Sequence, residues 1–75
     1  MSALSDQVLS VATIYLGPAA ATFLGRQTKF HMNGLDFTNL EKSHLPELAR
    51  WVEVSAKLLM DATRATELSQ KISSL

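Results

Sequence analysis

Residues 8–25 of the chain are VLSVATIYLGPAAATFLG, a stretch that decides the fold because it carries no charge and is interrupted by Gly17-Pro18. Glycine tolerates the left-handed backbone that follows a helix, and proline suits the first position of a new helix. The pair therefore predicts two helices joined by a tight turn, over about residues 3–16 and 18–32.

The same stretch is apolar enough to raise the question of a membrane span, but several features argue against one. The central break leaves each half well short of the roughly 20 residues that a spanning helix needs. The flanks lack basic and aromatic anchors, and the opening MSALSD carries an acid where a signal peptide has a basic region. Hydroxyl side chains also interrupt the run at Ser10, Thr13, Tyr15 and Thr22. We therefore expect a buried, soluble helix pair, no membrane contact and a cytoplasmic location.

The composition predicts a single helical domain over residues 1–75. A chain of this length has a thin core, and its 47% apolar content is too high for disorder. The lack of cysteine excludes disulfides and thiolate metal sites and favours a reducing cytoplasm. Seven basic residues balance seven acidic ones, so no strong field attracts nucleic acid or an anionic membrane.

The second half of the chain predicts a connection and two further helices. The connection is LDFTNLEKS, residues 35–43, in which Thr38 and Glu41 have the spacing of a capping box. One helix is expected to begin near Leu45, and a last helix follows Asp61. Together these elements predict an all-α fold, a small orthogonal bundle of four to five helices.

Residues at helical spacing, all of them apolar except Gln27, define the expected inner faces of this bundle. They are Leu4, Val8, Val11 and Tyr15; Ala20, Phe23, Leu24, Gln27 and Phe30; Leu48, Ala49, Val52, Ala56 and Leu59; and Ala65, Leu68, Ile72 and Leu75.

A second apolar row of Trp51, Val54 and Leu58 lies about 100° from the main stripe of its helix. Tryptophan is enriched among the residues that dominate interface energies. The row is therefore the candidate interaction surface, either for another protein or for a second copy of the chain in a dimer. A central helix would bury both rows, so the sequence leaves core and interface open for these residues.

No residue pattern points to catalysis, a cofactor, a metal or a small-molecule substrate. His31 and His44 are thirteen positions apart, whereas zinc needs three or four convergent ligands, so we expect solvated or capping histidines. No serine lies in a G-x-S-x-G elbow, and Gly17, Gly25 and Gly34 fit no phosphate-binding loop. A small helical domain also has little room for an enzymatic pocket. The chain is therefore not expected to be an enzyme.

The alternative function is DNA binding by a helix-turn-helix. The segment LARWVEVSAKLL, residues 48–59, has apolar or small residues at that motif's spacings, and Ser55 would open its second helix. Glu53 occupies the position of the usual turn glycine, and the same residues also fit one continuous amphipathic helix. Residues 45–65 thus remain open between the two structures. The neutral chain lacks the basic stripe of a DNA-binding domain, which argues against nucleic acid.

The segment LGPAAATFLGRQ resembles the start of a small helical domain at the C-terminal ends of some bacterial signalling proteins, including serine/threonine kinases and cyclase-linked regulators. Residues 45–72 fit that domain's closing helix pair loosely. The resemblance implies a non-enzymatic accessory role in bacterial signalling and carries over no catalytic residues. We therefore expect a protein–protein interaction or regulatory module. The matching residues are Leu16, Gly17, Pro18 and Ala20 in the turn and Arg26 in the basic end of the next helix.

Overall fold

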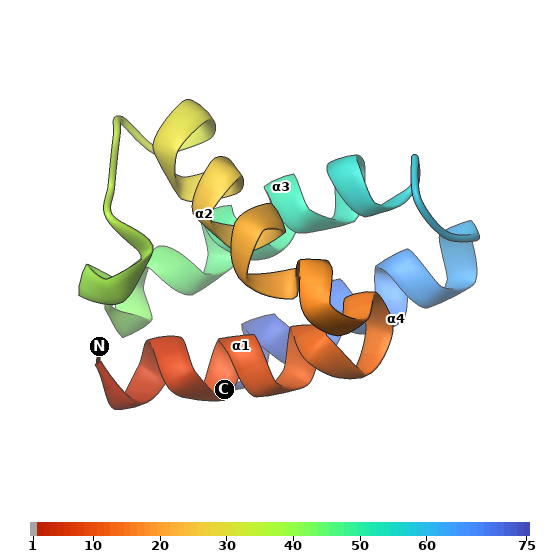
Figure 1. Ribbon diagram of the computed structural model, residues 1–75, viewed down its shortest axis with the longest axis horizontal. Coiled ribbons are helices and arrows are strands. Elements are labelled where there is room, and N and C mark those ends of the chain that lie inside the picture. The colour runs from red at the N-terminus through yellow and green to blue at the C-terminus, as the bar shows by residue number, and fades with distance from the viewer. Residues whose placement is uncertain (1) are drawn as a thin grey trace.

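The computed structural model describes residues 2–75, of which about 80% are helical and none lies in a strand. The all-α prediction is therefore confirmed (Figure 1). The α-helices are α1 (Ala3–Leu16), α2 (Ala20–His31), α3 (Leu45–Ala56) and α4 (Ala62–Ser73), with 3-10 turns at Gly17–Ala19, Phe37–Asn39 and Lys42–His44.

The predicted count of four to five separate helices is wrong. Helical structure continues without interruption from Ala3 to His31, because Gly17–Ala19 forms a 3-10 turn where a loop was expected. The helices α1 and α2 are therefore two limbs of one bent segment. The described residues thus form three continuous helical segments, over residues 3–31, 42–56 and 62–73, with one isolated 3-10 turn.

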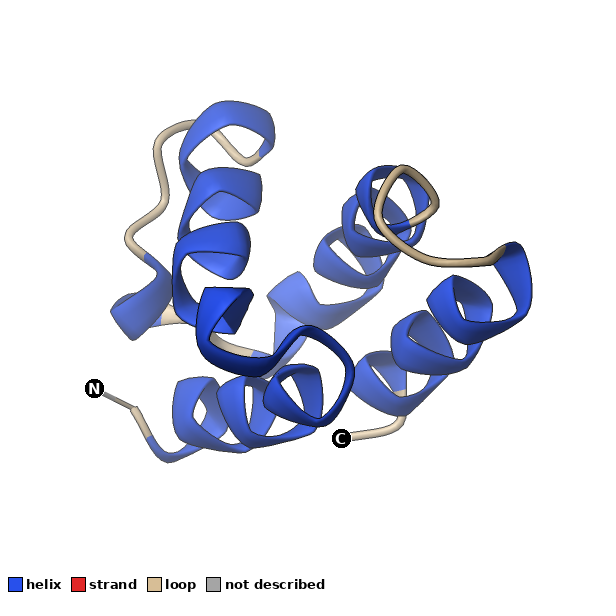
Figure 2. Ribbon diagram, turned by 45° about the vertical axis from the view of Figure 1, so that its right-hand side comes forward, coloured by secondary structure: helices blue, strands red, loops and turns tan. Residues whose placement is uncertain are grey.

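The bend between α1 and α2 depends on Gly17. Its φ is 60° and its ψ is −141°, a conformation open almost exclusively to glycine, and its N–H donates to the Thr13 carbonyl. Pro18 follows at the start of the 3-10 turn, where its missing N–H costs nothing. As predicted, the positive φ lets the chain turn so that α2 crosses over α1 (Figure 2).

Side-chain caps fix the starts of the first and last helices. The hydroxyl of Ser2 accepts a hydrogen bond from the Ser5 N–H at 3.0 Å and caps the start of α1. The Asp61 carboxylate accepts from the Arg64 N–H at 2.8 Å and starts α4. Each cap satisfies a backbone donor that has no partner within its helix.

The capping box predicted for Thr38 and Glu41 is wrong, because each residue belongs to a different turn. The Thr38 N–H donates to Oδ1 of Asp36 at 3.0 Å, and the Glu41 N–H donates to Nδ1 of His44 at 2.9 Å. The hydrogen bonds from Thr38 lower the pKa of Asp36 below its ordinary value. This contribution to stability is present above the ordinary aspartate pKa and is lost as the pH falls through the lowered pKa.

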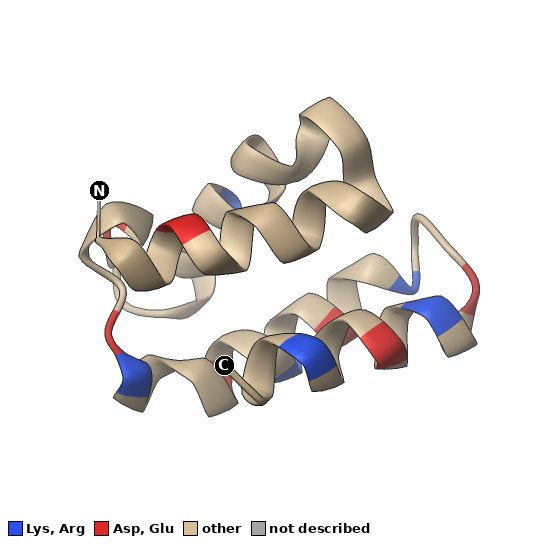
Figure 3. Ribbon diagram, turned by 90° about the horizontal axis from the view of Figure 1, so that it is seen from below, with Lys and Arg blue, Asp and Glu red and all other residues tan. Residues whose placement is uncertain are grey.

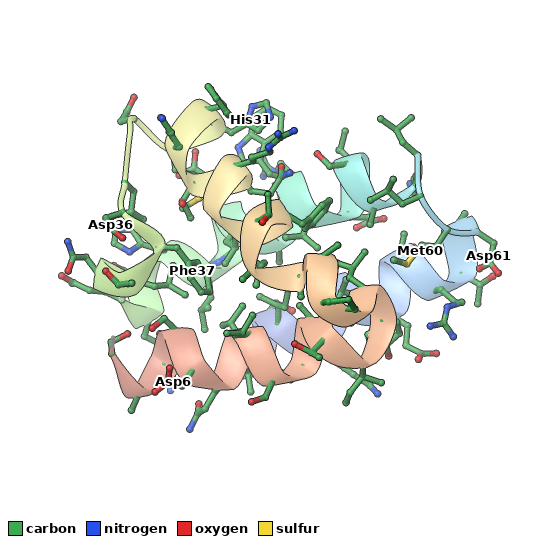
Figure 4. All side chains as sticks on the ribbon, in the orientation of Figure 1. Asp6, His31, Asp36, Phe37, Met60 and Asp61 are labelled. Carbon is green, nitrogen blue, oxygen red and sulfur yellow. The ribbon has the colours of Figure 1, made fainter. Side chains whose placement is uncertain are left out.

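The core lies between an antiparallel α3–α4 hairpin and the two limbs of the bent segment (Figures 1 and 3). Close approach of α3 and α4 is possible because small side chains line their contact, where the Ser69 hydroxyl donates to the Ala49 carbonyl at 2.9 Å. Phe37 and Leu40 of the connection are also buried, and Phe37 points inward (Figure 4). The helices bury Val8 and Ala12; Ala20 and Leu24; Leu48, Val52 and Ala56; and Ala65, Leu68 and Ile72.

Two predicted core residues, Phe30 and Leu59, are instead on the surface, 69% and 64% exposed. Phe30 lies in the last turn of α2, off the line of Leu24 and Gln27 that faces inward. Leu59 lies beyond the end of α3 at Ala56, in a turn that changes the chain direction toward α4. Both residues have the spacing of a core position. Phe30 nevertheless points away from the core, and α3 ends before it reaches Leu59.

The bent segment Ala3–His31 is long and apolar enough to cross a membrane by length and composition alone, with a mean hydropathy of 1.6 over its most apolar 18 residues. Core helices of water-soluble proteins pass the same test. Only 22% of that window is buried, because the helix pair buries one side, at Val8, Ala12, Ala20 and Leu24, and exposes the other. Ile14, for example, is 72% exposed. Between Asp6 and Arg26 the outer face of the segment therefore carries no charge.

Replacing Gly17 by Val is expected to destabilise the domain by more than about 1 kcal/mol, because a β-branched residue is strained at positive φ. The matched control is Gly25→Ala, since Gly25 lies within α2 and an added Cβ there has no atom within 4 Å. That variant is expected to gain about 0.4–1 kcal/mol through a less flexible unfolded chain. Urea unfolding followed by circular dichroism measures both, and an unchanged midpoint for Gly17→Val would contradict the role of the turn.

Candidate interaction surface

Two residues of the predicted interaction row, Trp51 and Val54, belong to α3, and Leu58 lies in the turn directly after it. Val54 is 55% exposed and Leu58 is 86% exposed, whereas Trp51 is half-buried and packs against the core. The exposed fraction of the side chains therefore differs along the row. Trp51 contributes to the core and reaches the surface, while Val54 and Leu58 contribute to the surface alone.

Two contacts with α2 hold this face of α3 in place. Gln27 is buried, and its Oε1 accepts a hydrogen bond from the Ser55 hydroxyl at 2.9 Å. One turn away along α3, the His31 and Trp51 rings stack with centroids 4.1 Å apart and planes 11° apart. Figure 4 shows His31 at the end of α2 beside α3. The indole is therefore held from two sides, by the core and by the imidazole.

His31 extends this face of α3 onto α2, because its ring lies on the indole of Trp51. We call the area formed by His31, Trp51, Val54 and Leu58 the α2–α3 surface. Phe30 precedes His31 in the last turn of α2, and its ring is also exposed, with the ammonium of Lys29 5.7 Å from the ring centroid. Neighbouring residues of a helix point in directions about 100° apart, so Phe30 is not counted as part of the α2–α3 surface.

Charged residues are unevenly distributed over the fold. Figure 3 shows most of them on α3, α4 and the connection, whereas α1 carries Asp6 alone. Within α3, Glu53 points toward α4, where it accepts from the Thr66 hydroxyl at 3.2 Å and pairs with Lys57 at 3.5 Å. The α2–α3 surface thus lies on the flank of α3 opposite this polar contact.

A second cluster joins α1 to α4 around Tyr15. The phenol donates a hydrogen bond to Oε1 of Glu67, while Arg64 and Lys71 lie over its ring at 5.0 Å and 5.4 Å from the centroid. Hydrogen bonding and charge from Tyr15 raise the pKa of Lys71 above its ordinary value. The stabilisation this gives is present at neutral pH and is lost as the pH rises through the raised pKa. The cluster fastens two helices, a role the sequence did not indicate.

Every buried side-chain nitrogen or oxygen of the described residues has a hydrogen-bond partner. Within residues 2–75, no three His, Asp or Glu side chains are grouped to hold a metal ion. His44 caps a turn, which agrees with the expectation of a capping histidine, and His31 stacks on Trp51. Shallow hollows of about 370–420 Å³ lie along α4, between α1 and α4, and between α2 and the connection. Their carboxylates, Glu67 and Asp36, are already engaged with Tyr15 and Thr38.

Residues 45–65 form two helices, but not with the turn that the helix-turn-helix pattern required. Glu53 and Ser55 lie inside α3, and the chain leaves that helix only after Ala56. The following turn leads into α4, which lies antiparallel to α3 (Figure 1). The predicted position of a DNA-binding turn at Glu53 is therefore wrong, whereas the alternative of one continuous helix is confirmed as far as Ala56, and residues 57–61 separate it from α4.

The variant Leu58→Glu is expected to change stability by no more than about 0.5 kcal/mol, because the side chain touches little of the folded domain. Trp51→Glu is expected to cost about 1–3 kcal/mol, because it removes core packing and the stack with His31. Thermal unfolding followed by circular dichroism compares the two variants. Equal losses of stability would contradict the division of the row into a core part and a surface part.

Comparison of the chain with protein-family models, with curated proteins and with solved structures finds no match.

Proposed function

We propose that the domain is a non-enzymatic protein–protein interaction or regulatory module, and that the α2–α3 surface is its contact site. The observation that carries the proposal is the exposure of Val54 and Leu58 in line with Trp51. An exposed leucine alone is ordinary, but apolar residues gathered on one face mark contact sites. The partner is another protein or a second copy of the chain.

The form of the surface supports this role. Trp51 is the kind of residue that dominates interface energies, because one rigid side chain removes a large apolar area from water. Its orientation is fixed before binding by the stack with His31 and by contact with the core. Less conformational freedom is then lost on association, which favours affinity.

The setting that we propose is signalling in the bacterial cytoplasm. Its support is the resemblance of the Leu16–Gly17–Pro18 turn and the following alanine-rich helix to the accessory domain of bacterial signalling proteins. A small helical module without a catalytic site would act in such a system by bringing proteins together. The proposal involves no membrane, cofactor or small-molecule substrate.

Capture experiments with matched variants test the contact site. The wild-type domain and Ile14→Glu are expected to retain the same protein from a lysate of the host organism, whereas Leu58→Glu is expected to lose it. Ile14 is a suitable control because it is also an exposed apolar residue, on α1. Loss of the captured protein with both variants, or with neither, would show that the α2–α3 surface is not the contact site.

The competing DNA-binding function makes a separate prediction. We expect no specific binding to duplex DNA, because the chain has no net charge and Glu53 pairs with Lys57 in the segment that the motif would use. Electrophoretic shifts with a random-sequence duplex library at physiological salt measure this. Sub-micromolar, sequence-dependent binding would favour a DNA-binding domain over the interaction module.

A further inference from the structure

We propose that Gly17-Pro18 is a lock against domain exchange. The pair keeps α1 packed on its own chain, and in its absence α1 packs in the same position on a second copy of the chain. This conformational device goes beyond the proposed function and does not depend on the α2–α3 surface. Three features carry it: the backbone of the turn, the length of the segment that the turn bends, and the contacts that attach α1.

A single residue separates the bent segment from a straight one. Helical structure is continuous from Ala3 to His31, and within this range Gly17 alone has a positive φ. On either side, Leu16 and Ala19 have φ and ψ in the right-handed helical region. A change of backbone conformation at Gly17 would therefore join α1 and α2 into one long helix.

Each residue of the lock opposes that long helix in a different way. Glycine adopts the φ of 60° and ψ of −141° without the steric cost that any other residue has there, so the bend is freely accessible. Pro18 suits the start of the 3-10 turn. Inside a straight helix its ring would instead clash with the Ile14 carbonyl, and it would supply no N–H to the helical hydrogen bonds. The glycine thus permits the bend and the proline disfavours the alternative.

A straight segment cannot keep α1 on its own core. Its 29 residues would form a helix about 44 Å long at 1.5 Å per residue, whereas the longest extent of the molecule is 29 Å. α1 would project from the domain and leave open the position that it fills beside α2 and α4 (Figure 1). The inner face of α1, with the buried residues Ser5, Val8 and Ala12, would then be exposed to water.

A second copy of the chain supplies a partner whose fit is already visible within one copy. The α1 helix of that copy can make every contact that α1 makes on its own chain, because the surfaces are the same. At the start of α1, the Ser2 N–H donates to the Thr38 carbonyl at 3.2 Å, and the Ser2 hydroxyl donates to the Leu40 carbonyl at 3.3 Å. Near its end, the Tyr15 phenol donates to Glu67. All of these hydrogen bonds would form again between the two copies.

The chain around Gly17 is also compatible with the approach of two straight segments. Residues 7–25 carry no charge, so two copies can meet there without burying an unpaired ion. Exposed residues close to Gly17 include the small side chains of Thr13, Ala19 and Ala21, which allow two helices to come near each other. The exchange therefore restores the buried contacts of α1 and opposes no charge to the new contact at the middle of each long helix.

Replacement of both lock residues tests the proposal. Alanine favours helical φ and ψ and is strained at positive φ, so Gly17→Ala with Pro18→Ala should straighten the segment. After refolding from urea, the double variant is expected to form an exchanged dimer in sedimentation equilibrium. Its association constant for exchange is expected to exceed that of the wild type at least about tenfold, because two turns change in each dimer. Isotope-filtered nuclear Overhauser effects in a mixture of labelled and unlabelled chains should connect Ser2 of one copy to Thr38 of the other.

The matched control is Gly25→Ala, which makes the same chemical change inside α2 and adds a Cβ with no atom within 4 Å. Its Ser2–Thr38 contact is expected to stay within one chain, as in the wild type. Circular dichroism verifies that the variants are folded. The proposal is overturned by a double variant that is monomeric or unfolded, or by a dimer of it whose Ser2–Thr38 contact stays within one chain. Equal exchange in the Gly25→Ala control overturns it as well.

Discussion

The backbone of Gly17 is the constraint on which the remaining structure depends. Helical hydrogen bonding continues through the 3-10 turn, so the change of direction between α1 and α2 comes from one residue with positive φ. Only in that direction can Gln27 meet Ser55 and His31 meet Trp51. A glycine in the most apolar part of the chain thus determines which face of α3 remains uncovered.

The sequence predicted the elements that depend on local chemistry. The start of α4 after Asp61 follows from a carboxylate that accepts a hydrogen bond from the Arg64 N–H. The start of α3 at Leu45 has no side-chain cap, and Pro46 in its first turn suits the beginning of a helix. The continuity through Gly17–Ala19 could not be predicted, because glycine followed by proline is equally compatible with a loop and with a 3-10 turn. The helix count depended on that distinction.

The surface was harder to predict than the elements. The helical periodicity of the sequence placed Trp51, Val54 and Leu58 in one row. The burial of each side chain, however, depends on where α2 packs against α3, and this cannot be predicted from a local sequence pattern. The same limit explains Phe30, whose spacing was typical of a core residue although α2 ends directly after it. The cluster of Tyr15 with α4 likewise joins residues about fifty positions apart, and only the fold brings them together.

The stack of His31 on Trp51 has a consequence for spectroscopy. Trp51 is the single tryptophan of the chain, and it lies at the edge of the core. In many small domains the tryptophan is deeply buried, and its emission follows global unfolding. Here the indole emission depends on the seam between α2 and α3, so it can respond when that seam opens or is covered while the far-ultraviolet signal of the helices stays constant. The protein thus contains a native optical probe of one particular face.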